Sequence, residues 1–333
     1  MGEVKQGRNS QENNPQKVLY TRVRYKHTKY RKRKHKRRRL WLSGITAIVF
    51  LLILWNGTAE MQARITPDYP KEELESTLDK QVLSEADYEL LFRQTGLGPL
   101  AVDELKKEGR ENAIFSMQDA FFSQLPIQCK ANSIISREER VVDVSQKGEL
   151  LPCLEDGDIL ITFNSHVLGW RNGHAALVVD AEKGLTLEAR VLGTDSAIMS
   201  IKHWERYPSF AVLRLKDADG QRRAEIASYA RENLVNVPYR LSAGWRDGIF
   251  SAVAQPPSLQ ETRAVGNLSE DDAKQVGTVV TGTHCSHLVW YAYLCFGYDL
   301  DSDGGLLVTP RDLYESEWLD TVQLYGMSVE KLE

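Results

Sequence analysis

The chain has 333 residues, of which 42 are Lys or Arg and 46 are Asp or Glu, and its formal net charge is −4. That length exceeds a typical single domain, so one domain with accessory segments is expected. The charge is divided unevenly: residues 1–39 contain 15 basic and 2 acidic residues, which leaves 27 basic and 44 acidic residues for the remainder. No P-loop, G-x-S-x-G, H-E-x-x-H or C-x-x-C motif occurs, so the enzyme classes that these motifs mark receive no support.

Residues 1–39 form a basic tail without hydrophobic periodicity, which predicts disorder. Residues 40–59 carry no charge and reach about the 20 residues that a bilayer core requires, so they predict a transmembrane anchor. The basic run before them predicts a cytoplasmic N-terminus and an exported body. Membrane topology and contact with anionic lipid explain the basic run more simply than binding to nucleic acid does. A cleaved signal peptide is the alternative, but its basic region would be unusually long. We therefore expect an uncleaved, single-pass protein of the cell membrane, with its body outside the cytoplasm.

Residues 60–126 predict a stem followed by a helical leader. Ser84 with Asp87 has the pattern of a helix start, and apolar residues follow it at helical spacing. The run from Gly96 to Pro99 is expected to interrupt the helix, and a second helix is expected over residues 102–107. This segment is read as a spacer or a docked subdomain without chemistry of its own.

The remaining residues, 127–333, predict one catalytic domain of the α+β class. Short β-rich runs follow one another with hairpin-sized links and favour an antiparallel meander. These runs cover residues 141–144, 158–163, 174–180, 185–191, 197–204 and 210–216. A helix is expected over residues 221–234, and Thr309, Pro310 and Asp312 have the pattern of a last helix start. Strands first and helices afterwards indicate α+β. Residues 255–283 are polar and predict a loop whose role the sequence does not specify.

Cys285 opens a strongly apolar segment that ends near Tyr298 and has helical periodicity. A thiol in the first turn of a helix lies among unpaired N–H groups at the positive end of the helix dipole, which favours the thiolate. The alternative is an ordinary buried thiol, because free Cys is among the most buried residue types.

A cysteine nucleophile needs a base and a third polar group that orients the base. His174 opens an apolar strand, where its ring can lie at a sheet edge, and Glu188 lies one hairpin later, within reach of an antiparallel neighbour. His166 is a second candidate base, but it falls in a connection between strands. Each residue has a structural alternative: His174 as a satisfied histidine of a sheet, and Glu188 as the solvent-facing side of a strand.

Together these motifs resemble a known family. D-G-D-I-L at 156–160, G-H-A at 173–175, L-E-A at 187–189 and C-S-H-L-V-W at 285–290 are similar to the circularly permuted NlpC-type cysteine peptidases of the YiiX-like branch. These enzymes are papain-like and are distant relatives of cell-wall hydrolases and of the lecithin:retinol acyltransferase group. The likeness covers about 155–312, and the leader around residues 83–98 resembles exported members from Gram-positive bacteria.

The resemblance implies a permuted papain-like fold with Cys285 as nucleophile, His174 as base and Glu188 as orienting residue. Tyr239, in a Pro-Tyr pair, matches a motif that the family places near the site, so an oxyanion or substrate contact is expected, with a packed loop tyrosine as the alternative. The implied activity is cleavage of an amide bond in peptidoglycan stem peptides without a cofactor. The alternatives are a lipid acyl hydrolase or acyltransferase and a non-catalytic wall-binding protein. The oligomeric state is left open.

Metal sites receive weak support. His284, Cys285 and His287 could ligate zinc, but a fourth ligand at the usual spacing is missing. The run from Asp299 to Gly304 imitates the start of a calcium loop, whose twelfth position is Pro310 where a Glu belongs. No metal is therefore predicted. In an exported domain Cys129 and Cys153 could pair, although spacing does not decide this.

Overall fold

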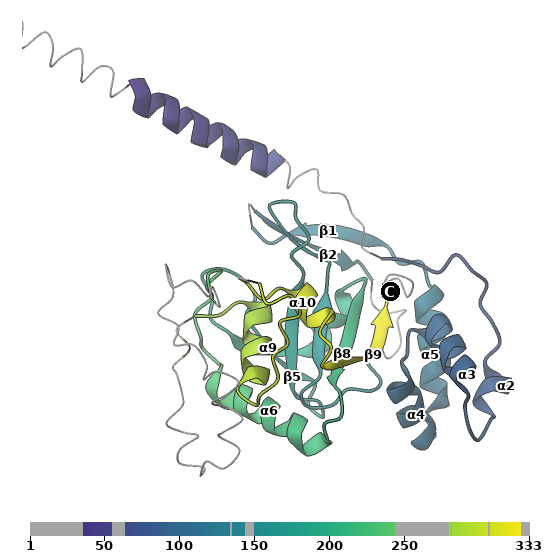
Figure 1. Ribbon diagram of the computed structural model, residues 1–333. Coiled ribbons are helices and arrows are strands. Elements are labelled where there is room, and N and C mark those ends of the chain that lie inside the picture. Colours follow the sequence, from purple (N-terminus) through teal and green to yellow (C-terminus); the bar gives the residue numbers. More distant parts are fainter. Residues whose placement is uncertain are drawn as a thin grey trace, which may run out of the picture. The chain divides into compact units, whose positions relative to one another are not determined.

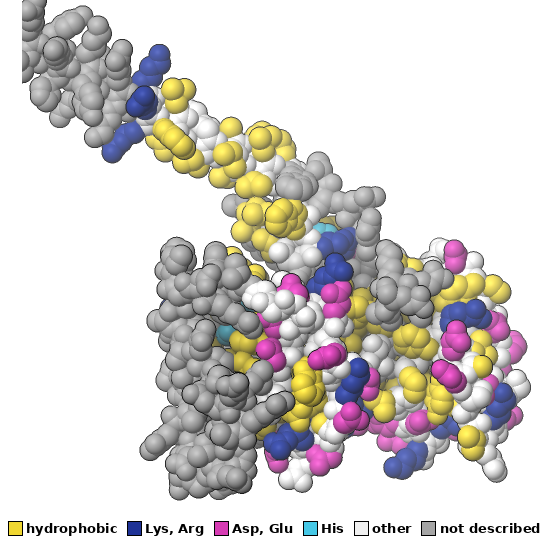
Figure 2. Space-filling model, in the orientation of Figure 1, with side chains coloured by type: hydrophobic (Ala, Val, Ile, Leu, Met, Phe, Trp, Pro, Cys, Tyr) yellow, Lys and Arg dark blue, Asp and Glu magenta, His cyan; other side chains and the backbone are white. Residues whose placement is uncertain are grey.

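The computed structural model describes residues 36–54, 64–133, 135–143, 150–243, 280, 282–305 and 307–327. The chain divides into two units, Met1–Gly57 and Thr58–Glu333. In the first unit, residues 36–54 form a helix, with basic side chains at one end and apolar side chains along the rest (Figure 2).

The predicted transmembrane anchor over residues 40–59 is not supported. Among the residues that the structure describes, no helix is both long enough and apolar enough to cross a membrane. The described helix over 36–54 includes the last residues of the basic run together with the first part of the apolar run. Residues 55–59 of the predicted span, the greater part of the tail and most of the loop over 255–283 lie outside the described residues.

The second unit begins with four helices: α2 (Glu75–Leu78), α3 (Glu85–Thr95), α4 (Pro99–Lys107) and α5 (Glu111–Phe122). The predicted start of α3 is confirmed, because Ser84 and Asp87 form a capping box. The predicted interruption is also confirmed, because α3 ends at Thr95 with Gly96 as its C-cap and Gly98 is the N-cap of α4. The second helix begins at Pro99 and not at residue 102, because the missing N–H of proline costs nothing at the first helical position.

Two antiparallel sheets follow, which confirms the mixed α+β class with antiparallel sheets. The smaller has the order β1-β2-β4 and the larger the order β7-β6-β5-β3-β8-β9. The strands of the smaller sheet are β1 (Ile127–Ala131), β2 (Ser136–Val141) and β4 (Ser165–Val167). Those of the larger are β3 (Ile159–Thr162), β5 (His174–Asp180), β6 (Leu185–Glu188), β7 (Ala197–Ser200), β8 (Phe210–Leu215) and β9 (Leu319–Tyr325).

Three expectations about the strands need correction. The strand expected over residues 141–144 runs instead over Ser136–Val141. The one expected over 197–204 ends at Ser200, where the Ser200 side chain caps the 3₁₀ helix η1 (Ile201–Arg206). The long run at 185–191 is a strand only as far as Glu188. Three strands were not identified from the sequence: β1, β4 and β9. His166, expected in a connection between strands, lies in β4.

The larger sheet separates two apolar cores, because successive side chains of a strand point to opposite faces. Ile159 and Leu177 belong to the core shared with α6 (Gly220–Asn233) and α9 (Cys285–Leu294), whereas Leu160 and Val178 belong to the core shared with the leader. Figure 1 shows α6 and α9 along one side of the sheet and α3–α5 beyond β9. The short helix α10 (Pro310–Tyr314) begins at the predicted Thr309 cap. Two packed faces leave little freedom to the strands that carry His174 and Glu188.

Candidate active site

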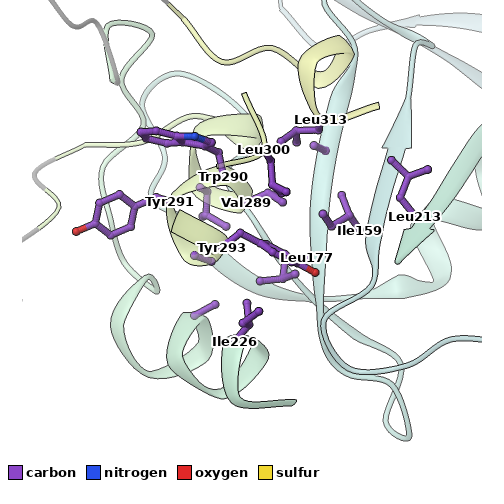
Figure 3. Close-up of a cluster of buried hydrophobic side chains, with 14 of the residues drawn as sticks. Ile159, Leu177, Leu213, Ile226, Val289, Trp290, Tyr291, Tyr293, Leu300 and Leu313 are labelled. Atoms are coloured by element: carbon purple, nitrogen blue, oxygen red, sulfur yellow. The ribbon is translucent and has the colours of Figure 1, made fainter. Parts of the chain in front are cut away.

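Cys285 is the first residue of α9, and the rest of this helix is buried almost completely. Figure 3 shows how Val289 and Tyr293 of α9 lie against Leu177 and Ile226 from neighbouring elements. An apolar helix packed on most of its sides cannot slide or rotate without opening cavities. The position of the Cys285 sulfur is therefore fixed by the packing of the helix that follows it.

The start of α9 is capped by a histidine. The His284 side chain accepts a hydrogen bond from the His287 backbone N–H, at 3.4 Å to Nδ1, and its Nε2 lies 3.2 Å from the carbonyl oxygen of Ala243. Because a carbonyl oxygen only accepts, Nε2 carries the proton and Nδ1 is free to accept. A cap of this kind satisfies one of the N–H groups of the first turn. The N–H groups of Cys285 and Ser286, the first two residues of the helix, have no partner within it.

His174 and Glu188 lie on adjacent strands of the larger sheet. Leu187 of β6 lies opposite Leu177 of β5, so Glu188 lies opposite Ala176 and on the same face as His174. The Nε2 atom of His174 is 2.7 Å from Oε2 of Glu188, and both side chains are buried. Nδ1 of His174 is thus left for Cys285, with which His174 shares a side-chain hydrogen bond.

Four donors surround the Glu188 carboxylate. Besides His174, the Thr186 hydroxyl donates to Oε1 at 2.6 Å and the Trp204 indole N–H donates to the same oxygen at 3.0 Å. The Nε2 atom of His203 lies 3.0 Å from Oε1 and 3.2 Å from Oε2. The Trp204 ring also stacks on His174, with 5.6 Å between centroids and 16° between planes. Saturated in this way, the carboxylate holds one orientation.

The charges of the site favour a thiolate–imidazolium pair. Burial by itself would raise the pKa of Cys285, but hydrogen bonds with His174 and His284 and the charge of His174 hold this pKa well below its ordinary value. Burial would lower the pKa of His174, but its bonds with Cys285 and Glu188 raise it to about 9. Burial would raise the pKa of Glu188, but His174 and His203 hold it well below its ordinary value. The site is therefore a buried array of opposite charges in which each ion has a partner.

Tyr239 lies beside the nucleophile. It forms a parallel bridge with Thr283, two residues before Cys285, and its own N–H donates to the Thr194 carbonyl at 3.0 Å. Burial and the charge of Cys285 raise the pKa of Tyr239. The hydroxyl thus stays protonated and can donate a hydrogen bond toward the sulfur or a group bound to it.

His166 is not part of this group. It lies in β4, is buried, and its Nε2 is 3.0 Å from Glu139, which also accepts from Arg171 at 2.7 Å and from Asn164 at 2.8 Å. These contacts join β2, β4 and the turn after β4 in a separate ionic network. His166 is therefore a structural histidine and not a second base.

His287 is also unsuited to act as a base. Its Nδ1 contacts the Thr283 hydroxyl at 3.1 Å, and its Nε2 has no hydrogen-bond partner among the described residues. Burial and the nearby His284 lower the pKa of His287 to about 3, so the ring stays neutral at physiological pH. The positive charge opposite the thiolate therefore does not come from His287.

The three residues Thr186, His203 and Trp204 were not identified from the sequence as parts of the site. Thr186 precedes Glu188 by two residues, so strand periodicity alone places both on one face. His203 and Trp204 reach the carboxylate only because the predicted strand turns into η1 after Ser200. No local pattern in the sequence indicates that turn.

Groups that could hold a metal ion lie elsewhere among the described residues. Carboxylate oxygens of Asp301, Asp303 and Asp312 lie within 4.8 Å of one another, near the run that imitates a calcium loop. His284, Cys285 and His287 do not form such a group within the described part of the chain. Cys129 and Cys153 are both free thiols, so they do not form the disulfide considered above.

Comparison of the chain with family models, with curated proteins and with solved structures found no match. The geometry of the site is accordingly the evidence on which a function has to be argued.

Proposed function

We propose that the chain is a cysteine hydrolase that cleaves an amide bond, with the permuted papain-like arrangement that its motifs resemble. The observation that carries the proposal is a buried triad at the start of α9, in which Nε2 of His174 lies 2.7 Å from Oε2 of Glu188 and His174 pairs with Cys285. Nucleophile, base and orienting group are the three parts that nucleophilic catalysis by a thiol needs. The proposed substrate is the peptide part of peptidoglycan, outside the cytoplasm.

The proposed mechanism begins with the thiolate. The Cys285 sulfur attacks the carbonyl carbon of the scissile amide, and the carbonyl oxygen becomes an oxyanion near the N–H groups of Cys285 and Ser286, with the Tyr239 hydroxyl as a further donor. The C–N bond then breaks as His174 gives its proton to the leaving amine, which leaves a thioester on Cys285. A water molecule, deprotonated by His174, attacks the thioester and releases a carboxylic acid and the thiol. Glu188 stabilises the imidazolium and keeps Nε2 protonated throughout.

The chain carries internal controls for a direct test of the nucleophile. Burial raises the pKa of Cys153 to about 12, and burial likewise raises the pKa of Cys295. Alkylation with iodoacetamide at pH 6–7, mapped by peptide mass spectrometry, should therefore modify Cys285 rapidly and leave these two thiols intact. The His174→Ala variant should lose the rapid reaction, and Cys285→Ala should lose the labelled peptide. Labelling of Cys285 at the rate of a free thiol, indifferent to His174, would refute the proposal.

A second candidate function is acyl hydrolysis or acyl transfer on a lipid, because apolar side chains are exposed on loops that lie close to the site residues along the chain. Trp170 is 63% exposed shortly before His174, Leu192 is 68% exposed shortly after Glu188, and Leu241 is 59% exposed shortly after Tyr239. Exposed Trp and Leu side chains of this kind suit contact with an apolar ligand. Assays with muropeptides and with phospholipid vesicles separate the two candidates: release of an amine from the muropeptide supports the first, and release of a fatty acid alone supports the second.

A further inference from the structure

His203 is the one titratable donor on Glu188, among the described residues, that the proposed mechanism does not use. Its side chain is 18% exposed, whereas the Glu188 side chain is fully buried. It lies in η1, next to Trp204, and η1 follows β7, which pairs with β6 on the side opposite His174's strand β5. A histidine in this position either fills space at the edge of the site or contributes to its charge.

The contacts of the two ring nitrogens decide between these roles. Nδ1 of His203 is 2.6 Å from the carbonyl oxygen of Ser200, and Nε2 is 3.0 Å and 3.2 Å from the two oxygens of Glu188. A carbonyl oxygen and an ionised carboxylate can only accept, so each ring nitrogen must donate. A neutral imidazole has one N–H and would leave a lone pair against one of these oxygens. Only the imidazolium satisfies both contacts.

We propose that His203 is a positioning residue that binds Glu188 as an imidazolium and so shares the catalytic carboxylate with His174. The role in catalysis rests on the proposed function, whereas the charge of His203 follows from its own contacts. With both rings protonated, the Cys285 thiolate, His174, Glu188 and His203 form a chain of alternating charges. The charge of His203 limits how strongly Glu188 attracts the proton of His174, and thereby sets the pH at which that proton is lost.

The charged groups around His203 are compatible with this assignment. Arg140 of β2 donates to the His203 backbone carbonyl at 2.8 Å, but its guanidinium is neutralised by Glu138 at 2.6 Å. Arg190 after β6 pairs with the same Glu138, at 3.5 Å. On η1 itself the titratable neighbours are Lys202, Glu205 and Arg206. The His203 ring contacts the carboxylate of Glu188 directly.

The state of His203 can be observed without any substrate. In the folded protein labelled with ¹⁵N-histidine, NMR correlations between ring nitrogens and ring protons distinguish an imidazolium from either neutral tautomer. Assignment uses the His203→Gln variant, which lacks the signal. The expected result at pH 7 is a His203 ring protonated on both nitrogens. A neutral ring with one N–H would overturn the proposal, whatever the activity of the protein.

The effect on the site is measured through alkylation of Cys285 by iodoacetate, an anion whose reaction is assisted by the His174 imidazolium. In the wild type the rate should fall at alkaline pH with a midpoint near 9, where His174 loses its proton. His203→Gln keeps a neutral donor but removes the charge, so the midpoint should rise by about half to one pH unit. Lys202→Gln removes a neighbouring exposed cation that does not contact Glu188, and it should leave the midpoint unchanged.

The outcomes separate this inference from the proposed function. An unchanged or lowered midpoint in His203→Gln would overturn the role of His203, even if Cys285 stays reactive. A rate lowered equally at every pH indicates loss of packing and overturns it too. If Cys285 shows no activated reaction in the wild type, the proposed hydrolase fails, and the NMR measurement still decides the charge of His203.

Discussion

Replacing Glu188 with Gln should abolish the activation of Cys285 while preserving the shape of the site. The amide oxygen of Gln can still accept from Thr186 and Trp204, which contact Oε1 of the carboxylate at 2.6 and 3.0 Å. Its NH₂ group then takes the place of Oε2 and faces Nε2 of His174. Two donors cannot share a hydrogen bond, so His174 must present a lone pair at Nε2 and carry its proton on Nδ1. Nδ1 can then no longer accept a proton from Cys285.

The magnitude follows from the fraction of thiolate. In the wild type the pKa of Cys285 lies well below its ordinary value, so the thiol is ionised at pH 7. Without the imidazolium, a thiol with an ordinary pKa near 8.5 is only ~3% ionised at pH 7, and burial reduces this fraction further. The alkylation rate of Glu188→Gln at pH 7 should therefore fall about thirtyfold or more. Hydrolysis should lose on the order of 10³- to 10⁴-fold, as expected when a catalytic histidine is held in the wrong tautomer.

The assay is the rate of iodoacetamide alkylation of Cys285 between pH 5 and 9, followed by mass spectrometry. Glu182→Gln is the matched control, because Glu182 is exposed in the hairpin between β5 and β6 and the substitution is the same. Near-UV circular dichroism of both variants reports whether the fold is retained. If folded Glu188→Gln reacts at the wild-type rate with the wild-type pH midpoint, then Glu188 does not orient His174 and the reasoning is refuted.

Three further predictions concern pH and the scaffold. Since the pKa of His174 is raised to about 9, the protonated ring persists through neutral pH, and hydrolysis of an amide substrate should decline only above about pH 9; a decline centred near pH 6.5 would contradict the ion pair. Gly96 has φ +73°, and a Cβ there would lie 1.9 Å from the Leu324 carbonyl oxygen, so Gly96→Ala should lower the free energy of unfolding in urea by more than about 3 kcal/mol. The control is Gly109→Ala, which has φ +68° but open space around it and should cost about 1 kcal/mol. Equal costs would refute the role of the α3–β9 contact. Thr309→Ala removes the capping box of α10 and should cost about 1 kcal/mol, seen as a Tm lowered by ~2–4 °C; an unchanged Tm would show that Asp312 caps the helix alone.

The sequence predicted the parts of the fold whose signals are local. The helix starts at Ser84 and Thr309 are recognisable because each residue forms a capping box with an Asp three residues later. The strand β5 is recognisable because it is a continuous apolar run, typical of a buried strand. The pairing of β9 with β8 joins Thr321 to Leu213, more than a hundred residues apart, and nothing near either residue announces it. The predicted membrane span continues past Leu54, and its last five residues, 55–59, lie outside the part of the chain that the structure describes.

The residues of the candidate site also divide into those with a local sequence signal and those without one. Three could be proposed because each has a recognisable place within one element. Cys285 begins an apolar helix, His174 begins an apolar strand, and Glu188 lies in the next strand. Trp204 and His203 could not be proposed as site residues, because their roles depend on the 3₁₀ helix after Ser200. The alternating sequence around Ser200 predicts a continued strand there. Polar side chains act on a site through distances of about 3 Å, and such distances are fixed by packing between elements and not by periodicity within them.

The alternating charges of the site give the two central variants opposite signs. Glu188→Gln removes the anion that stabilises the His174 imidazolium, so it should shift the loss of the His174 proton to lower pH. His203→Gln removes a cation on the far side of that anion, so it should shift the same loss to higher pH. Damage to packing would impair both variants in the same direction. Opposite shifts of one midpoint, measured by iodoacetate alkylation of Cys285, would therefore establish that His203 acts through the charge of Glu188, and shifts of equal sign would exclude it.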